Sequence, residues 1–232
     1  RDRLYAKGVR AGDVRYFDYN EDGDITDADR VNVGKAIPDF YGGITSNFSY
    51  KGFDLSLFGQ FSVGGKVMAA WRGVNGSEGT DHLGLALSNV KVGDRGESVE
   101  QFFNISKEVA NGYWRGEGTS KSIPRPVRIG VHTGYDYDYN VQTSTRYLED
   151  ASYFKLKTVT LGYTLPESIT KKIHVNSLRV YVSADNLLTF TKYSGYDPET
   201  SFSGSPGDSN YGVDFGLQPV LRTFIFGLNL NF

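Results

Sequence analysis

Long stretches in which apolar and polar side chains alternate limit most strongly how this chain can fold. The clearest pattern runs from residue 43 to residue 50 and resumes from residue 53 to residue 63. Lys51 and Gly52 separate the two stretches and have the length of a two-residue hairpin loop. Such a turn predicts an antiparallel hairpin whose cross-strand pairs all lie on one face. These pairs are Tyr50–Phe53, Phe48–Leu55 and Ser46–Leu57.

Three further segments alternate in the same way, namely residues 153–164, 178–186 and 220–232. In the first of them Phe154 and Leu156 are out of phase with the residues that follow, which predicts a β-bulge near Lys157. The chain contains 16 Tyr, 15 Phe and 28 Gly, a composition that favours antiparallel strands and tight turns. The sequence therefore predicts an all-β fold.

The connections between these five predicted strands alternate in length. Residues 51–52 and 165–177 make short connections, whereas residues 64–151 and 188–219 make long polar ones. A transmembrane β-barrel has this layout, because its turns are short on the periplasmic side and its loops are long outside. Five strands cannot close a barrel, and an open strand edge is not tolerated in lipid. We therefore expect the chain to be part of a larger protein.

The overall composition excludes several other classes of protein. Lys and Arg total 25 against 27 Asp and Glu, so the basic excess of a nucleic-acid-binding protein is missing. The chain has no Cys, so it has no disulfide framework and no thiol nucleophile. No stretch approaches the roughly 18 apolar residues of a membrane-spanning helix. His82, His132 and His174 are isolated, and no catalytic motif is present, so we expect no enzyme and no catalytic residues.

An acidic segment from Asp18 to Asp29 carries the strongest chemical motif. It fits the spacing of an EF-hand calcium loop, with Gly23 at the turn and Asp29 in place of the usual final Glu. A strand-like stretch precedes it, so a two-helix EF-hand is not expected. We predict a structural divalent cation here, Ca²⁺ ahead of Mg²⁺; the alternative is an Asx-rich turn without an ion. The predicted ligands are Asp18, Asn20, Asp22, Asp29 and the backbone carbonyl of Asp24.

Aromatic residues scattered through the first long connection are weak candidates for substrate binding. They can stack on sugars, but packing within the loops or a place in an interfacial aromatic girdle is the more common role of such residues. The candidates are Trp71, Trp114, Tyr135 and Tyr137.

Five blocks, in this order, resemble the C-terminal end of SusC/RagA-type TonB-dependent outer-membrane transporters. The first begins with Gly12-Asp13-Val14-Arg15-Tyr16, continues through the acidic segment and ends with Pro38-Asp39-Phe40-Tyr41-Gly42-Gly43. The others are residues 48–57, 153–166, 178–189 and 222–232. The resemblance covers nearly the whole chain except the two long loops, which vary within that family.

The resemblance implies a barrel of about 22 strands with an N-terminal plug in the outer membrane of a Gram-negative bacterium. It further implies a SusD-like surface lipoprotein as partner, oligosaccharides or peptides as cargo, and energy from TonB through a segment not in this chain. On this view residues 1–42 form an extracellular loop. Residues 43–232 form barrel strands in membrane lipid, with long loops 64–151 and 188–219 outside and the C-terminus in the periplasm. A soluble, calcium-binding carbohydrate-recognition β-domain is the alternative.

Overall fold

The computed structural model describes residues 9–72, 84–86, 89–92, 97–100, 107–125, 127–129, 140, 142–199 and 212–232. The chain divides into two compact units. One unit comprises residues 1–33 and 68–148, and the other comprises residues 34–67 and 149–232.

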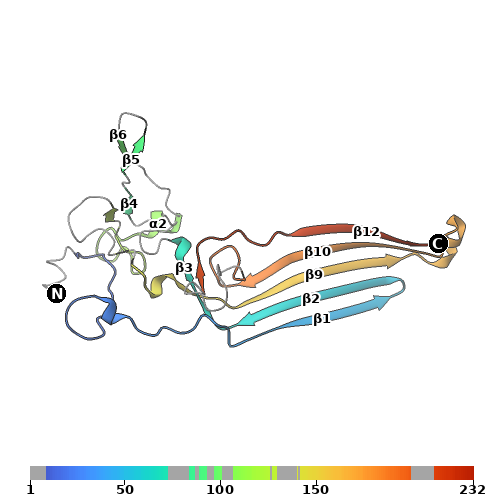
Figure 1. Cartoon of the computed structure of the whole chain (residues 1–232), viewed down its shortest axis with the longest axis horizontal. Coiled ribbons are helices and arrows are strands. Elements are labelled where there is room, and N and C mark those ends of the chain that lie inside the picture. Colours follow the sequence, from blue (N-terminus) through green and yellow to red (C-terminus); the bar gives the residue numbers. More distant parts are fainter. Residues whose placement is uncertain are drawn as a thin grey trace. The chain divides into compact units, whose positions relative to one another are not determined.

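The second unit is built on a five-stranded antiparallel sheet in the order β1-β2-β9-β10-β12. Figure 1 shows the β1–β2 turn, the connection from β9 to β10 and the C-terminus at one end of this sheet. That connection holds two short helices, α3 (Glu167–Thr170) and η6 (Lys171–Ile173). The five strands are β1 (Phe40–Tyr50), β2 (Phe53–Val63), β9 (Tyr153–Thr164), β10 (Ser177–Thr191) and β12 (Thr223–Asn231).

The predicted hairpin register is confirmed. Tyr50 pairs with Phe53, Phe48 with Leu55 and Ser46 with Leu57. Lys51 and Gly52 both have positive φ angles, 46° and 86°, as the tight turn that joins two twisted strands requires.

The predicted bulge at Lys157 is confirmed as well. Along β2, Phe58 pairs with Thr158 and the next residue, Gly59, pairs with Leu156, so Lys157 is the extra residue of β9. Opposite it, the β10 register jumps from Asp185 to Leu188. Asn186 and Leu187 are skipped in this register and break the alternation of the sequence, so the predicted strand ends at residue 186. In the structure β10 continues to Thr191.

The sheet has two chemically different faces, which we call the apolar face and the polar face. Neighbouring strands add their alternating side chains in register, so each face continues across all five strands. The apolar face remains widely exposed: Phe53 is 51% exposed, Phe48 59% and Phe226 80%. From β2 to β12 it consists mainly of Phe53, Leu55, Leu57, Phe61, Phe154, Leu156, Val159, Leu161, Tyr163, Val180, Val182, Leu188, Phe190, Phe224, Phe226, Leu228 and Leu230.

Aromatic rings gather near both ends of the apolar face. At the end with the short connections, the rings of Phe53 and Tyr163 lie 4.5 Å apart between centroids. At the other end, Phe154 lies 6.2 Å from Phe190, and Phe40 makes a similar pair with Phe61. Between these two bands, β2, β9 and β10 carry mainly aliphatic side chains on this face.

In the described part of the first unit, the helices and strands are short. Its helices are η1 (Asp27–Asp29), η2 (Ala70–Arg72), α2 (Lys107–Gly112) and η5 (Thr145–Tyr147). A small core is formed by Val109 and Ile123, against which Tyr113 packs. Its strand pairs are β4 (Gly84–Ala86) with β7 (Val127–Ile129), which are parallel, and β5 (Asn89–Val92) with β6 (Glu97–Glu100), which are antiparallel.

The described residues also form a three-stranded sheet in the order β11-β3-β8. Its strands are β3 (Lys66–Ala69), β8 (Leu148–Asp150) and β11 (Val213–Asp214). Among the described residues, no helix has both the length and the apolar character needed to cross a membrane.

Candidate functional site

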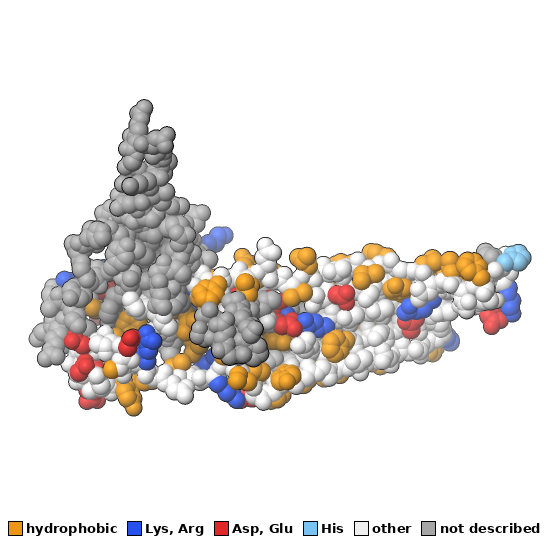
Figure 2. Space-filling view, in the orientation of Figure 1, with side chains coloured by type: hydrophobic (Ala, Val, Ile, Leu, Met, Phe, Trp, Pro, Cys, Tyr) orange, Lys and Arg blue, Asp and Glu red, His pale blue; other side chains and the backbone are white. Residues whose placement is uncertain are grey.

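The polar face of the sheet holds most of its charged side chains in ion pairs or hydrogen bonds. Figure 2 shows basic and acidic side chains beside one another on one side of the sheet, within a largely uncharged surface. Two side-chain contacts join β9 to β10. Thr158 donates to the Asp185 carboxylate at 3.0 Å, and the hydroxyls of Thr160 and Ser183 lie 2.8 Å apart. The polar side chains of this face therefore satisfy one another across neighbouring strands.

Asp54 and Arg179 form a two-pronged ion pair near the end with the short connections. Arg179 Nε donates to Asp54 Oδ1 at 2.9 Å and Arg179 Nη2 donates to Oδ2 at 2.6 Å. The pair lies over Gly162, where a Cβ would come within 2.5 Å of both Arg179 Nη2 and Asp54 Oδ1. Glycine therefore allows the guanidinium to lie flat on the sheet.

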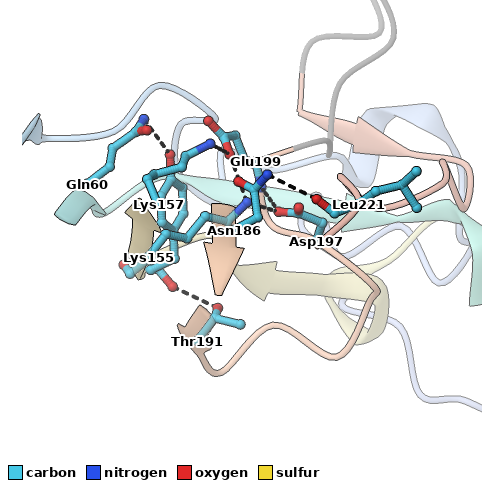
Figure 3. A network of polar contacts seen from close by, with 10 residues as sticks. Gln60, Lys155, Lys157, Asn186, Thr191, Asp197, Glu199 and Leu221 are labelled. Atoms are coloured by element: carbon cyan, nitrogen blue, oxygen red, sulfur yellow. Dashed lines mark hydrogen bonds and ion pairs between the residues drawn. The ribbon is translucent and has the colours of Figure 1, made fainter. Parts of the chain in front are cut away.

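A denser network lies toward the other end of the polar face (Figure 3). Lys155 donates to Asp197 and, at 2.8 Å, to Glu199 Oε2; Lys157 donates to the same oxygen at 2.6 Å. The two carboxylates come from the segment that follows β10. Gln60 Nε2 donates to the Tyr153 hydroxyl at 3.3 Å beside them. The bulge contributes to the network, because it adds Lys157 to this face next to Lys155.

Burial differs sharply between the two halves of this network. The side chains of Lys155 and Asp197 are 2% and 7% exposed, whereas those of Lys157 and Glu199 are 19% and 29% exposed. Burial alone would raise the pKa of Glu199, but the hydrogen bonds from Lys155 and Lys157 outweigh it and lower that pKa below its usual range. Glu199 is thus ionised at neutral pH and balances the charge of the lysines.

The acidic segment folds into successive turns held by its own side chains. Asp18 Oδ2 accepts from the Gly23 N–H at 2.9 Å, Asn20 Oδ1 from Asp22 at 3.1 Å, and Asp22 Oδ1 from Asp24 at 2.8 Å. Asp29 accepts from the Thr26 and Tyr19 N–H groups at 2.7 and 2.8 Å.

These contacts lower the pKa of the Asp29 carboxyl, the Thr26 N–H being the largest cause. Within the described part of the chain, no three acidic or histidine side chains gather closely enough to hold a metal ion. The cation at Asp18, Asn20, Asp22, Asp24 and Asp29 therefore remains a prediction.

The aromatic candidates for substrate binding fall into two groups. Tyr135 and Tyr137 lie outside the described residues. Trp71 lies in η2, and Trp114 packs on Gly12 so closely that a Cβ there would lie 2.2 Å from its ring. Trp114 therefore has a packing role in the first unit, and substrate binding by any of the four stays a prediction.

Alternation along residues 53–63 is sufficient to put Asp54 and Gln60 on one face, but no pattern in the sequence predicts the network around Lys155. Alternation placed polar residues on β9, yet Asp197 and Glu199 lie about 40 positions away in an irregular segment. The only signal was the pair of lysines at positions 155 and 157, which needed acidic partners if buried.

Similar proteins of known family identify the family of this chain, although no family model matches it. It is 33% identical over 225 residues to TonB-dependent receptor P3 of Formosa agariphila, a match that covers 95% of this chain and 19% of that receptor. TonB-dependent receptor SusC of Bacteroides thetaiotaomicron is 25% identical over 232 residues, covering 99% of this chain and 19% of SusC. The chain thus spans about a fifth of the length of the curated relatives it matches.

Two solved structures share the fold. The RagAB peptide transporter aligns with a TM-score of 0.56 at 24% identity, over 84% of this chain and 17% of that one. The RagAB peptide importer in its closed-closed state aligns with a TM-score of 0.56 at 23% identity, over 89% of this chain and 19% of that one. Because TonB-dependent receptor P3 is 33% identical over 95% of this chain, the chain belongs to the SusC/RagA-type TonB-dependent receptors, a family of non-enzymatic outer-membrane proteins.

Proposed function

We propose that this chain supplies five neighbouring strands to a transmembrane β-barrel of about 22 strands in an outer-membrane importer. The importer takes up oligosaccharides or peptides together with a SusD-like surface lipoprotein. The two-faced sheet carries the proposal. Its apolar face is widely exposed, and an exposed apolar surface of this extent in water would favour aggregation. Against lipid chains the same face is stable, and the aromatic bands at its two ends match the girdles of a membrane barrel.

The polar face then lines the lumen of the barrel. Its charges are paired: Asp54 and Arg179 pair across strands, and Lys155 pairs with Glu199 of the segment after β10. The open edges at β1 and β12 pair with the remaining strands of the barrel, because unpaired backbone groups are not tolerated in lipid. Family membership favours this function over a soluble carbohydrate-recognition domain.

The lengths of the connections give the orientation. The short connections and the C-terminus share one end of the sheet, which we assign to the periplasm. Residues 1–42 and the long connections, predicted as 64–151 and 188–219, then lie outside the cell. There they contact the SusD-like partner and the cargo. TonB supplies energy through a segment not in this chain.

Both cargo classes belong to the proposal. RagAB, whose fold this chain shares in part, is a peptide transporter, which supports the peptide class for a receptor of this fold. A structural cation in the acidic segment would stiffen the extracellular side, because neighbouring carboxylates repel one another until a cation neutralises them.

Digestion of intact cells with trypsin tests the orientation. Lys121 lies in the first long connection, whereas Lys171 and Lys172 lie in the short connection between β9 and β10, with the Lys171 side chain 74% exposed. In cells that carry the full-length receptor, we expect cleavage at Lys121 and protection of Lys171 and Lys172. Permeabilising the outer membrane should then open the lysine pair to cleavage. Cleavage at Lys171 or Lys172 in intact cells, with Lys121 protected, would reverse the assigned orientation.

A further inference from the structure

We propose that Lys155 and Lys157 form a binding site for a carboxylate group of the cargo, and that Glu199 occupies this site until the cargo displaces it. This inference rests on the proposed function, because cargo passes the two lysines only if the polar face lines the lumen. It adds a chemical preference to that function: cargo with an acidic group is favoured over its neutral counterpart.

The Glu199 carboxylate lies between the ammonium groups of Lys155 and Lys157, as a bound carboxylate ligand would. A single oxygen, Oε2, accepts from Lys155 at 2.8 Å and from Lys157 at 2.6 Å. Figure 3 shows the side chains of Lys155 and Lys157 pointing toward the carboxylates of Asp197 and Glu199. Any carboxylate that reaches the lysines meets the same pair of charged donors.

The two halves of the network differ in how readily they can exchange. Lys155 and Asp197 are almost fully buried, so separating them would leave charges unpaired in a poorly solvated place at a large cost. Asp197 also accepts from the Glu199 N–H at 2.9 Å, which holds the turn together. Lys157 and Glu199 are partly open to solvent. Asp197 therefore anchors the segment, and Glu199 is the group that can leave.

Exchange at Glu199 keeps every buried charge paired. The incoming carboxylate replaces Glu199 against the same two ammonium groups, and Glu199 moves into water, where its charge is well solvated. Because Glu199 is tethered, it competes at an effective concentration of millimolar order. The wild-type site therefore excludes dilute anions and admits an acidic group only from cargo that makes other contacts. Removing Glu199 should expose the intrinsic affinity of the lysine pair.

Calorimetry on the purified full-length receptor tests the inference with two pairs of probes. One pair is a blocked Gly-Glu-Gly tripeptide and its Gly-Gln-Gly counterpart; the other is digalacturonate and neutral digalactose. The variants are Glu199→Gln, which removes the competitor and retains a polar side chain, and Glu199→Gln combined with Lys157→Gln. Glu167→Gln is the matched control, since it removes one exposed carboxylate that pairs with Lys171 at 2.7 Å elsewhere. Retained heat-modifiable migration shows that each variant is folded.

We expect Glu199→Gln to bind an acidic probe at least about tenfold more tightly than the wild type, because removing a tethered competitor strengthens binding by about the ratio of its effective concentration to its own dissociation constant. Its neutral counterpart should show no gain, the added Lys157→Gln should abolish the gain, and Glu167→Gln should behave as the wild type. The acidic probe that responds identifies the source of the carboxylate, peptide or sugar. Equal binding of both acidic probes by wild type and Glu199→Gln overturns the proposal, as does a gain that survives Lys157→Gln. The trypsin experiment tests the proposed function separately, and its outcome does not depend on these binding results.

Discussion

Single side chains in the five-stranded sheet divide between its apolar and polar faces according to their position in a strand. Leu228 and Asn229 are neighbours on β12, yet Leu228 pairs with Val180 on the apolar face and Asn229 pairs with Arg179 on the polar face. Alternation in the sequence was sufficient to assign both faces. It was not sufficient to find the partner of Asp54, because Arg179 lies 125 positions away and only the register of three strands brings the two together.

This division predicts opposite responses to the same substitution at adjacent positions. Leu228→Arg in the full-length receptor should cost about 2–4 kcal/mol if the residue lies near the bilayer midplane, because an arginine there must leave water. Asn229→Arg should cost much less, because the lumen is polar. The free energy of unfolding in lipid vesicles measures both. Equal costs at the two positions would contradict the assignment of the faces.

The acidic segment is predicted to bind Ca²⁺, which its internal hydrogen bonds alone do not require. Asp18 Oδ1 is shielded from solvent and has no hydrogen-bond partner in the described part of the chain, so it is available to a cation. Calorimetry on the full-length receptor should show Ca²⁺ binding with a dissociation constant of about 10⁻⁴–10⁻³ M. Asp18→Ala and Asp22→Ala should abolish this binding. Asp27→Ala should retain it, because Asp27 pairs with Arg30 and lies outside the ligand set. If the wild type binds no Ca²⁺ at millimolar concentration, the segment is only an acidic turn.

At the scale of elements, regular strands were predictable and interruptions were only partly so. The β1–β2 hairpin follows from a two-residue turn and a strict period, both of which are local. The bulge at Lys157 left a visible phase change in β9, but its counterpart in β10 ended the recognisable pattern at residue 186. The remainder of β10 to Thr191 was hidden because its phase is set by pairing with β9.

Asn186 should be the residue that allows this interruption of β10. It has a φ of 53°, a left-handed conformation that Asn and Gly adopt more easily than other residues, and its Nδ2 donates to the Leu221 carbonyl at 3.1 Å. Asn186→Ala should lower the free energy of unfolding by about 1–2 kcal/mol. Asn186→Gly should cost less, because it keeps the conformation and loses only the hydrogen bond. A larger loss for glycine than for alanine would show that the backbone conformation is not the cause.

At the scale of the whole molecule, the family, the strands and the lengths of the connections were predictable from the sequence, but the structure within the long connections was not. Periodicity and the resemblance agreed on five strands with short and long connections, and the comparisons confirmed the family. The sequence of residues 64–151 shows no strand period, and the described part of this range makes distant contacts such as the ion pair of Arg125 with Asp13 at 2.6 Å. The Lys155 network was missed for the same reason, because its carboxylates come from an irregular segment.

In the proposed barrel, one face of the sheet meets lipid and the other meets an aqueous lumen. Spin labels attached one at a time to cysteines introduced at positions 224–231 of the full-length receptor, in lipid vesicles, test this most directly. Positions 224, 226, 228 and 230 should be accessible to molecular oxygen, which concentrates in lipid. Positions 225, 227, 229 and 231 should be accessible instead to a water-soluble nickel chelate, giving a period of two along the strand. An accessibility profile without that period, or with the two sets of positions exchanged, would contradict the account.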